Sequence, residues 1–416
     1  MSVPTVEPVA RTTTVPFLQT PPGRALKALA SLRLTVVLFA LSIVLVFVGT
    51  LAQMDQGIHS VVGAYFRSWI VLVPFQLFVR FGQVFFSVPT TASLPGAFPF
   101  PGGWTLGTLL LVNLLAAHLI RFKLSWKRGG IIMLHAGIVV LLLSELITGL
   151  SAVEGRMSIN EGESADYTFR IHDSELVLIS RSDAKVDDVV AIPQHRVARG
   201  GVINDERLPV DVEVTKWFRN AAVRRPQGET SNPATAGEGL DWVAVERQES
   251  SGMSSDVDLP SAYVTLKEKG GGKALGTYLV SVVVDAQSVE IGGKPYELAL
   301  RFRRDYKPFR LHLIDFRFDR YEGTAIAKNY SSLVRLVDPD QGVDREVLIR
   351  MNEPLRYAGE TYYQADFDKD TEKGTVLQVV RNPAKWWPYY ACGLVSIGMM
   401  WHFGFHLAGF LRRRAV

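Results

Sequence analysis

The chain has 416 residues, 48% of them hydrophobic, and a mean hydropathy of +0.14. These values exclude a protein that lies in the membrane throughout, and they indicate membrane segments joined to a water-soluble part. The net charge of +4 does not indicate a nucleic-acid partner, because the basic residues cluster beside apolar runs, as membrane topology signals do. The single cysteine, Cys392, excludes thiol redox chemistry by this chain alone.

The apolar runs predict four membrane-spanning helices. Residues 1–23 come first, are rich in Pro and Thr, and are expected to form a flexible cytoplasmic tail. A bilayer core needs roughly 20 apolar helical residues. Runs of that kind occupy residues 34–51, 104–120, 130–150 and 386–411. Basic clusters precede the first run, separate the second from the third and follow the fourth, so both termini are predicted to be cytoplasmic.

Residues 54–103 are aromatic and punctuated by Pro and Gly. Their central run, AYFRSWIVLVPFQLFVRFG, is interrupted by Arg67, Pro74 and Arg80. We interpret this run as an amphipathic helix that lies on the outer membrane interface. A fifth span is the poorer candidate, because arginines stand at both ends of the run and a proline stands within it.

The long segment between the third and fourth runs is predicted to be a β domain outside the membrane. Alternating apolar and polar residues predict strands, and the pair Gly292-Gly293 between two such stretches predicts a hairpin. We expect a mostly antiparallel sandwich or barrel-like domain. Residues 220–261, rich in Gly, Ser, Pro and Glu, are expected to form a long surface loop.

The predicted fold class is therefore an α+β membrane protein. Its four transmembrane helices, three N-terminal and one C-terminal, carry a large, mostly antiparallel, extracytoplasmic β domain. Its predicted parts are a tail at 1–23, three transmembrane helices at 24–150 with the outer interfacial segment at 54–103, the β-rich domain at 151–384, and the last helix with its basic tail at 385–416.

Four histidines lie in or beside the spans, at His118, His135, His402 and His406. Counted from the helix ends, all four fall in the cytoplasmic half, with His406 level with His135 and His402 one turn deeper. Imidazole is a good axial ligand for haem iron, and an ionisable group inside a span is costly to bury. The alternatives are an interfacial role for His118 beside Arg121 and an interhelical hydrogen bond for His402 or His406.

Other ionisable groups give weaker signals. Glu145, near the outer end of the third span, is expected to reach the interface or to pair with a partner. The remaining histidines, His59, His172, His195 and His312, show no metal-ligand spacing, and His312 is predicted to be an ordinary strand residue. From the chemistry of its residues alone, the chain is a membrane-anchored β domain with histidines inside the membrane.

Three stretches carry a resemblance to a known family. Residues 352–367 read NEPLRYAGETYYQADF, an Asn-Pro pair precedes the fourth span, and residues 31–53 read SLRLTVVLFALSIVLVFVGTLAQ. Together they resemble the ResB (CcsB) family of cytochrome c biogenesis proteins. The order of three spans, a large outer domain and one span also matches that family.

The resemblance implies a multi-pass protein of the bacterial cytoplasmic (inner) membrane. It implies that haem b is transported or transiently bound, and that a ResC/CcsA-type partner joins in presenting it to apocytochrome c outside. It also implies that His135 is an axial ligand of haem iron. The chain would be a non-catalytic or partial subunit of a cytochrome c haem lyase complex, because it offers at most one ligand and a scaffold, while the partner supplies the haem-handling loop. No C-x-x-C-H occurs in the chain, so it does not itself carry covalently attached c-type haem.

Two other functions stay open. A b-type electron-transfer subunit would hold haem between His118 and His135, or between the third and fourth spans, and paired ligands at similar depth on facing helices would favour it. A membrane-anchored interaction module without cofactor would be colourless. The polar run at 352–364 has two interpretations as well: it docks the β domain onto the membrane and positions the fourth span, or it contacts substrate directly.

Overall fold

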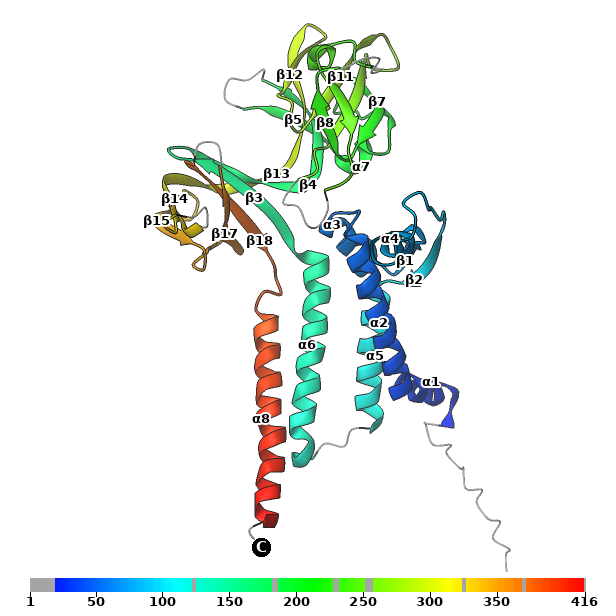
Figure 1. Ribbon diagram of the computed structural model, residues 1–416. Helices are drawn as coiled ribbons and strands as arrows, with labels where there is room; N and C mark the ends of the chain where they lie inside the picture. The colour runs from blue at the N-terminus through cyan, green and yellow to red at the C-terminus, as the bar shows by residue number, and fades with distance from the viewer. Residues whose placement is uncertain are drawn as a thin grey trace, which may run out of the picture. The chain divides into compact units, whose positions relative to one another are not determined.

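A computed structural model describes residues 19–121, 125–181, 186–226, 232–250, 257–323, 327–368 and 372–414. The chain divides into two compact units (Figure 1). We call the first the membrane unit; it comprises the described residues of Met1–Ala52, Val61–Gly149 and Ala384–Val416. We call the second the β unit; it comprises those of Gln53–Ser60 and Leu150–Pro383.

Within the described residues, four helices are long and apolar enough to cross a membrane. They are α2 (Leu32–Ala52), α5 (Gly103–Arg121), α6 (Gly129–Ser151) and α8 (Trp387–Arg414). All four runs predicted to be apolar helices are therefore helices. The short 3-10 helix η3 (Trp126–Arg128) leads into α6.

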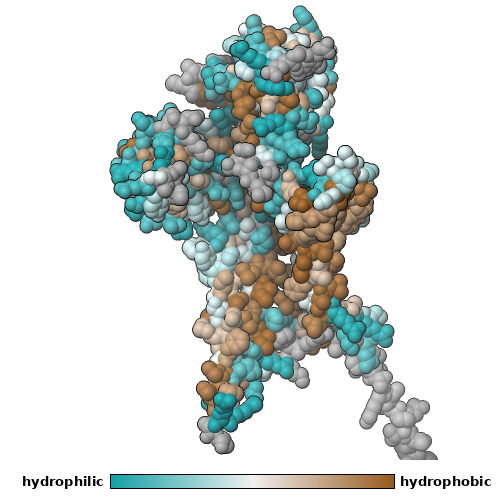
Figure 2. Space-filling view, in the orientation of Figure 1, coloured by the Kyte–Doolittle hydropathy of each residue, from teal (hydrophilic) through white to brown (hydrophobic). Residues whose placement is uncertain are grey.

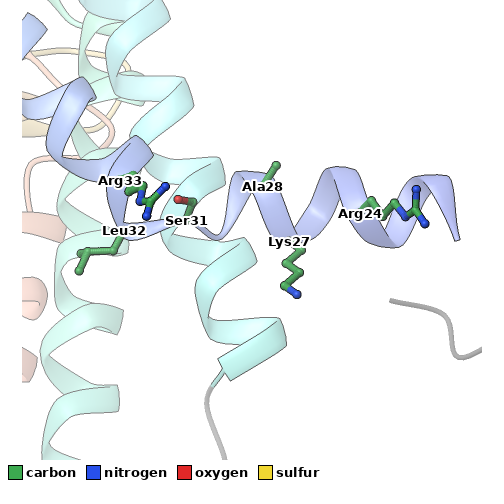
Figure 3. A pocket seen from close by; sticks show the side chains of 6 residues that line it. All are labelled: Arg24, Lys27, Ala28, Ser31, Leu32 and Arg33. Atoms are coloured by element: carbon green, nitrogen blue, oxygen red, sulfur yellow. The ribbon is translucent and has the colours of Figure 1, made fainter. Parts of the chain in front are cut away.

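The helix α1 (Pro21–Leu29) precedes α2. The hydroxyl of Thr20 accepts a hydrogen bond from the Gly23 amide at 3.4 Å, and Pro21 occupies the first helical position, as helix N-termini favour. The predicted flexible tail is thus wrong from Pro21 onward, while residues 1–18 lie outside the described part. Arg24 and Lys27 project from different sides of α1 (Figure 3), so this junction with α2 is a basic surface and not a closed ligand cavity.

Small residues let α6 and α8 pack closely in antiparallel directions. A Cβ atom added to Gly130 would lie 2.6 Å from the carbonyl oxygen of Gly398, and one added to Gly398 would lie 2.8 Å from the Gly130 carbonyl oxygen. Further toward the other end of α6, Gly137 faces Ala391 and Val395 in the same way. Close approach through glycine is a common basis of helix association in membranes.

A buried amide fixes the junction of α1, α2 and α5. Asn113 of α5 donates from Nδ2 to the carbonyl oxygens of Leu29, at 2.5 Å, and Ser31, at 3.1 Å. Its Oδ1 accepts a hydrogen bond from the Thr35 hydroxyl at 2.7 Å. The amide thereby satisfies carbonyl groups freed where the chain turns from α1 into α2.

The segment between α2 and α5 is not the single amphipathic helix that we predicted. It forms α3 (Ile58–Val61), the π-helix η2 (Val62–Phe66), β1 (Ile70–Pro74), α4 (Gln76–Phe85) and β2 (Ala97–Pro101). β1 pairs antiparallel with β2. The run Ile70–Val73 favours a strand because of its branched side chains, and Pro74 lacks the amide hydrogen that a continuing helix needs. Only α4 keeps the predicted amphipathic helix.

The β unit is built on antiparallel sheets, as predicted. The largest has ten strands in the order β15-β14-β13-β4-β3-β18-β17-β16, with β5 beside β4 and β12 beside β13. Its strands are β3 (Val153–Asn160), β4 (Ser164–Ser180), β5 (Asp188–Pro193), β12 (Gln287–Ile291), β13 (Lys294–Arg320), β14 (Ala327–Asp338), β15 (Val343–Arg350), β16 (Leu355–Tyr357), β17 (Glu360–Phe367) and β18 (Gly374–Arg381).

Two smaller sheets complete the β unit. One has the order β11-β10-β7-β6 and the other pairs β8 with β9. Their elements are β6 (Gly201–Ile203), β7 (Asp211–Phe218), β8 (Ala221–Arg224), β9 (Val243–Glu246), β10 (Ser261–Lys267) and β11 (Ala274–Ser281), with short helices α7 (Gln194–Val197) and η4 (Gly237–Leu240). Part of the predicted surface loop at 220–261 is therefore regular structure, while residues 227–231 and 251–256 lie outside the described part.

Two large apolar cores, with a smaller cluster around Tyr263, hold the β unit together. One gathers buried side chains such as Leu176, Val212 and Leu298, and the other gathers Met157, Leu313 and Tyr362. The strand β13 is 27 residues long and contributes to both cores. The predicted hairpin at Gly292-Gly293 is confirmed: it joins β12 to β13, and both glycines have positive φ, of 58° and 76°.

Candidate functional site

Two of the histidines predicted to lie in the membrane meet across neighbouring helices. The rings of His118, on α5, and His135, on α6, have centroids 4.7 Å apart and planes inclined at 78°. Both side chains are half-buried. His118 Nδ1 lies 2.8 Å from the Leu114 carbonyl oxygen, which can only accept, so Nδ1 carries a hydrogen. Apolar helices thus bring two imidazoles together, one of them with a fixed tautomer.

The other two histidines form a second group on α8. The rings of His402 and His406 lie 4.6 Å apart, one helical turn from each other. Gly130 packs against the backbone of His402, since a Cβ atom on Gly130 would lie 2.7 Å from the His402 amide nitrogen. The position of His135 is five residues further along α6, about 7 Å along the axis. His402 is therefore level with the start of α6, and His406 lies one turn beyond it.

The expected level of His406 with His135 is thus wrong. Counting from helix ends assumed that α6 and α8 end at the same height, whereas α8 continues past the start of α6 (Figure 1). The buried Nδ1 of His402 has no hydrogen-bond partner within the described residues, and His406 is exposed on its helix. The structure brings together His118 with His135, and His402 with His406, as two pairs at different levels.

The His118–His135 pair fits the chemistry of a haem ligand. Its donors are imidazoles on apolar helices, the ligand type that haem iron accepts. Because the two rings already touch, a metal held between both would require them to separate, so the arrangement fits one imidazole as a ligand better than two. Among the described residues, no cluster of three or more His, Cys, Asp or Glu side chains is suited to an ordinary metal ion.

Glu145 has a partner within the membrane unit. Its Oε1 lies 3.9 Å from Arg67 Nη2, and both side chains are exposed. An exposed pair of this kind contributes about 0–1 kcal/mol. The pair joins Arg67, which follows η2, to the C-terminal part of α6.

The polar run at 352–367 forms a hairpin at one edge of the large sheet. The strands β16 and β17 pair, and Ala358 and Gly359 turn between them with φ of 47° and 80°. Tyr362 is fully buried and donates to Glu360 Oε2 at 2.8 Å. Burial, together with the Glu360 carboxylate, raises the pKa of the Tyr362 phenol well above its usual value.

Other residues of the same run also serve the packing of the β unit. Lys307 Nζ donates to Glu360 Oε1 at 2.6 Å, and the Tyr357 hydroxyl donates to Asp338 Oδ2 at 2.7 Å. Gln364 accepts a hydrogen bond from the buried hydroxyl of Ser332 at 2.6 Å. The hairpin is therefore explained chiefly by a satisfied polar network around the core. Its role in docking onto the membrane stays a prediction.

A third histidine pair, which has no sequence signal, lies in the β unit. The rings of His59 and His172 are stacked with centroids 4.1 Å apart and planes inclined at 9°. His172 belongs to β4 at a register shift in its pairing with β13, where three residues bulge out. Burial, with the neighbouring His59 as the next cause, lowers the pKa of His172 to about 4. The two residues are far apart in the sequence, so no spacing rule would find them.

Hydrogen bonds hold the segment that carries His59. The Ser60 hydroxyl donates to Glu249 Oε2 at 3.0 Å and accepts from Arg219 Nη2 at 2.6 Å. Arg219 Nη1 also lies 3.4 Å from Glu249 Oε1. Elsewhere, His312 lies in β13 as predicted, with its Nδ1 3.1 Å from the Ser164 hydroxyl. These contacts give His59, His172 and His312 of the β unit structural explanations.

Comparison with known proteins bears on the family and not on the histidines. Residues 275–375 match the model of the ResB-like family. Protein NrfI of Wolinella succinogenes is 29% identical over 309 residues, which are 71% of this chain and 29% of NrfI, so the chain spans less than a third of that relative. The solved structure of Cytochrome c Heme Lyase CcmF aligns over 78% of this chain and 33% of its own, at 10% identity and a TM-score of 0.19, too low to support any argument. The resemblance to the ResB family that the sequence motifs indicate is confirmed, and residues 275–375 of the chain form a ResB-like region.

Proposed function

We propose that this protein is a ResB-like subunit of a cytochrome c maturation complex in the bacterial cytoplasmic membrane. In this proposal it handles haem in the membrane and scaffolds the attachment of haem to apocytochrome c, together with a ResC/CcsA-type membrane partner. The ResB-like region and the four apolar helices support the role. The observation that carries the haem part is the contact between the His118 and His135 rings.

The proposed topology has both termini in the cytoplasm and the β unit outside. Basic residues support it at two places: Lys127 and Arg128 just before α6, and Arg412–Arg414 at the end of α8. In an antiparallel pair of helices, these two places lie at the same side. The His118–His135 contact then falls in the inner half of the membrane, where haem made in the cytoplasm would enter.

Haem is the cargo in this proposal, and when bound it supplies the iron for ligation and the vinyl groups for thioether bonds. His135 is the proposed axial ligand. His118 orients it, because the Leu114 carbonyl fixes the His118 tautomer and the two rings meet edge to face. The chain itself completes no thioether chemistry, since its single cysteine, Cys392, lies on α8. Apocytochrome c and the partner would supply the rest.

The visible absorption spectrum of the chain, purified alone and with a co-expressed ResC/CcsA-type partner, tests the proposal. A haem band in the complex is expected to be lost in His135→Ala and restored by added imidazole. His406→Ala is the matched control, because His406 is exposed and lies at a different level, and it is expected to keep the band. Unchanged haem content and cytochrome c assembly in His135→Ala would refute His135 as a ligand.

The same contact favours a second candidate, a b-type haem electron-transfer subunit. Such a subunit needs paired imidazoles at one level on facing helices, and His118 and His135 would be such a pair if their touching rings separated to admit haem. This candidate predicts that the chain retains stoichiometric haem without any partner and that the haem is reduced and reoxidised reversibly. The maturation proposal predicts substoichiometric haem in the chain alone. A protein that is colourless alone and in the complex would instead be a cofactor-free interaction module.

A further inference from the structure

The segment from β1 to β2, which includes α4, forms a small lobe of the membrane unit. We call residues 69–101 the outer lobe. One side of it packs against α2 and α5: Val71, Val73 and Leu77 are buried in a core that also contains Val48 of α2 and Leu106 of α5. These contacts hold the lobe against α2 and α5.

The strand β1 is apolar on both of its faces. Val71 and Val73 point into the core, while Ile70 and Leu72, which alternate with them, are 68% and 67% exposed. A strand that separates core from water normally alternates apolar with polar residues. β1 therefore needs a second apolar neighbour on its outer face.

The helix α4 ends in exposed aromatic side chains. Leu77 and Gly82 are buried, while Phe85 and the following Phe86 are 65% and 72% exposed, with ring centroids 4.7 Å and 5.9 Å from that of Phe81. Figure 2 shows hydrophobic surface continuing from the helices α2 and α5 onto this lobe. A contiguous exposed apolar surface of this kind marks a membrane or protein contact.

Three contacts fix the level of the outer lobe relative to the spans. Phe81 of α4 packs edge to face against Phe47 of α2, with ring centroids 5.6 Å apart. Phe47 is five residues before the end of α2, so the lobe reaches about 7 Å below that end. The ion pair of Arg67 with Glu145 ties the start of the lobe to the outer end of α6.

An aromatic contact marks the same level on α5. Trp69, at the start of the lobe, meets Trp104 in the first turn of α5, with ring centroids 5.6 Å apart. Tryptophan is enriched where membrane spans meet water. The lobe thus lies beside the ends of α2 and α5, at the height where a bilayer interface would lie.

We propose that the outer lobe is an interfacial membrane wedge. Its outer face, formed by the exposed side chains of Ile70, Leu72, Phe85 and Phe86, is inserted among the lipids of the outer leaflet. The proposal rests on the four apolar helices crossing the membrane and not on haem handling. Lipid is the occupant because hydrophobic surface continues from the spans onto the lobe, and because the lobe reaches below the end of α2. Amphipathic elements lie in this position with their apolar face in the acyl boundary and their charges toward water.

Depth-dependent fluorescence quenching tests the wedge. The full chain with Cys392→Ser and Phe85→Cys would carry a fluorescent thiol label and be reconstituted in phosphatidylcholine vesicles with nitroxide lipids labelled near the head group or deep in the acyl chain. The label at position 85 is expected to be quenched most by the shallow nitroxide. Phe39→Cys, exposed in the middle of α2, is expected to be quenched most by the deep one.

A control in the β unit and a second site keep the test decisive. Val202→Cys, on the exposed strand β6, is expected to show no lipid quenching, and Leu72→Cys repeats the measurement on β1. The proposal is overturned if positions 72 and 85 behave like position 202. It is also overturned if, in the assembled complex, both positions are shielded from lipid and from aqueous quenchers, because the face would then bind a protein.

Discussion

The two cross-element histidine pairs of this protein have opposite surroundings. His118 and His135 meet edge to face on apolar helices of the membrane unit. His59 and His172 are stacked on the surface of the β unit, where Asp258, Arg156 and Arg219 act on the pKa of His172. Ring proximity alone therefore does not define a site. The environment decides what the rings can do.

The two pairs differ in what each ring would contact if the pairing were lost. In the β unit, water can solvate each ring, and the stack helps to hold residues 53–60, which Ser60 also anchors. In the membrane unit, an imidazole that is not engaged would face hydrocarbon at a substantial cost. The His118–His135 pair is thus the stronger candidate for function. The His59–His172 pair is explained by its part in holding residues 53–60 in the β unit.

The largest expected effect separates the two pairs directly. His135→Ala is expected to remove most of the haem from the complex and to abolish most cytochrome c assembly, because it removes the proposed ligand. His172→Ala is expected to leave both unchanged. Haem content by pyridine haemochrome spectra and cytochrome c by haem staining would measure this. A loss of similar size in both variants would show that the surface pair also handles haem.

A second prediction concerns the support of the membrane pair by α8. By helix propensity alone, Gly→Ala in a helix stabilises by roughly 0.5–1 kcal/mol. Gly130→Ala should instead destabilise by about 1–3 kcal/mol, because its Cβ would lie 2.6 Å from the Gly398 carbonyl oxygen. Thermal unfolding in detergent measures the change.

Gly404→Ala is the matched control for Gly130→Ala. It lies on α8, and a Cβ atom there would meet nothing within 4 Å. It is expected to be neutral or slightly stabilising. If the two variants unfold at the same temperature, the close contact of α6 with α8 is not a feature of the protein in its membrane environment.

The apolar helices could be predicted from sequence because run length and hydropathy report them directly. The similar depth of His118 and His135 can also be predicted from sequence, since a short connection joins α5 to α6 and keeps their ends together. The level of His402 could not be predicted, because no short loop ties the end of α8 to α6. Its position is set by Gly130 and Gly398, a packing detail that local pattern does not contain.

The outer lobe and the β-unit pair show two further limits. β1 is apolar on both faces, so its run lacks the alternation that distinguishes a half-buried strand from a helix. His59 and His172 come together only because residues 53–60 fold with the β unit. The family motif at 352–364 was identifiable as a pattern, but its role in a buried network required the position of Lys307 on β13.

A third prediction concerns Ser60, whose hydroxyl helps to hold the segment that carries His59. Ser60→Ala removes the hydroxyl that joins Glu249 to Arg219 and is expected to cost about 0.5–1.5 kcal/mol. The expected readout is faster limited proteolysis between α2 and α3, with unchanged haem content. Thr50→Ala is the control, because its exposed hydroxyl bonds only within α2, to the Val46 carbonyl oxygen. Equal cleavage rates in both variants would mean that Ser60 does not hold the segment.

The smallest expected effect is a pH dependence carried by the surface pair. The pKa of His172 is lowered to about 4 in the folded protein, from an ordinary value of 6.5. The unfolded chain therefore binds more protons than the folded one between these two values, and stability falls as the pH drops from 6.5 toward 4. The loss is modest because the His59 ring and its neighbours cover only part of the His172 side chain, and water reaches the rest. His172→Phe keeps a ring for stacking but does not titrate, so its unfolding temperature should fall less than that of wild type between pH 7.5 and pH 5. If the two proteins lose stability equally over that range, His172 does not carry the pH dependence, and the stack would be a packing contact whose protonation is the same in the folded and unfolded chain.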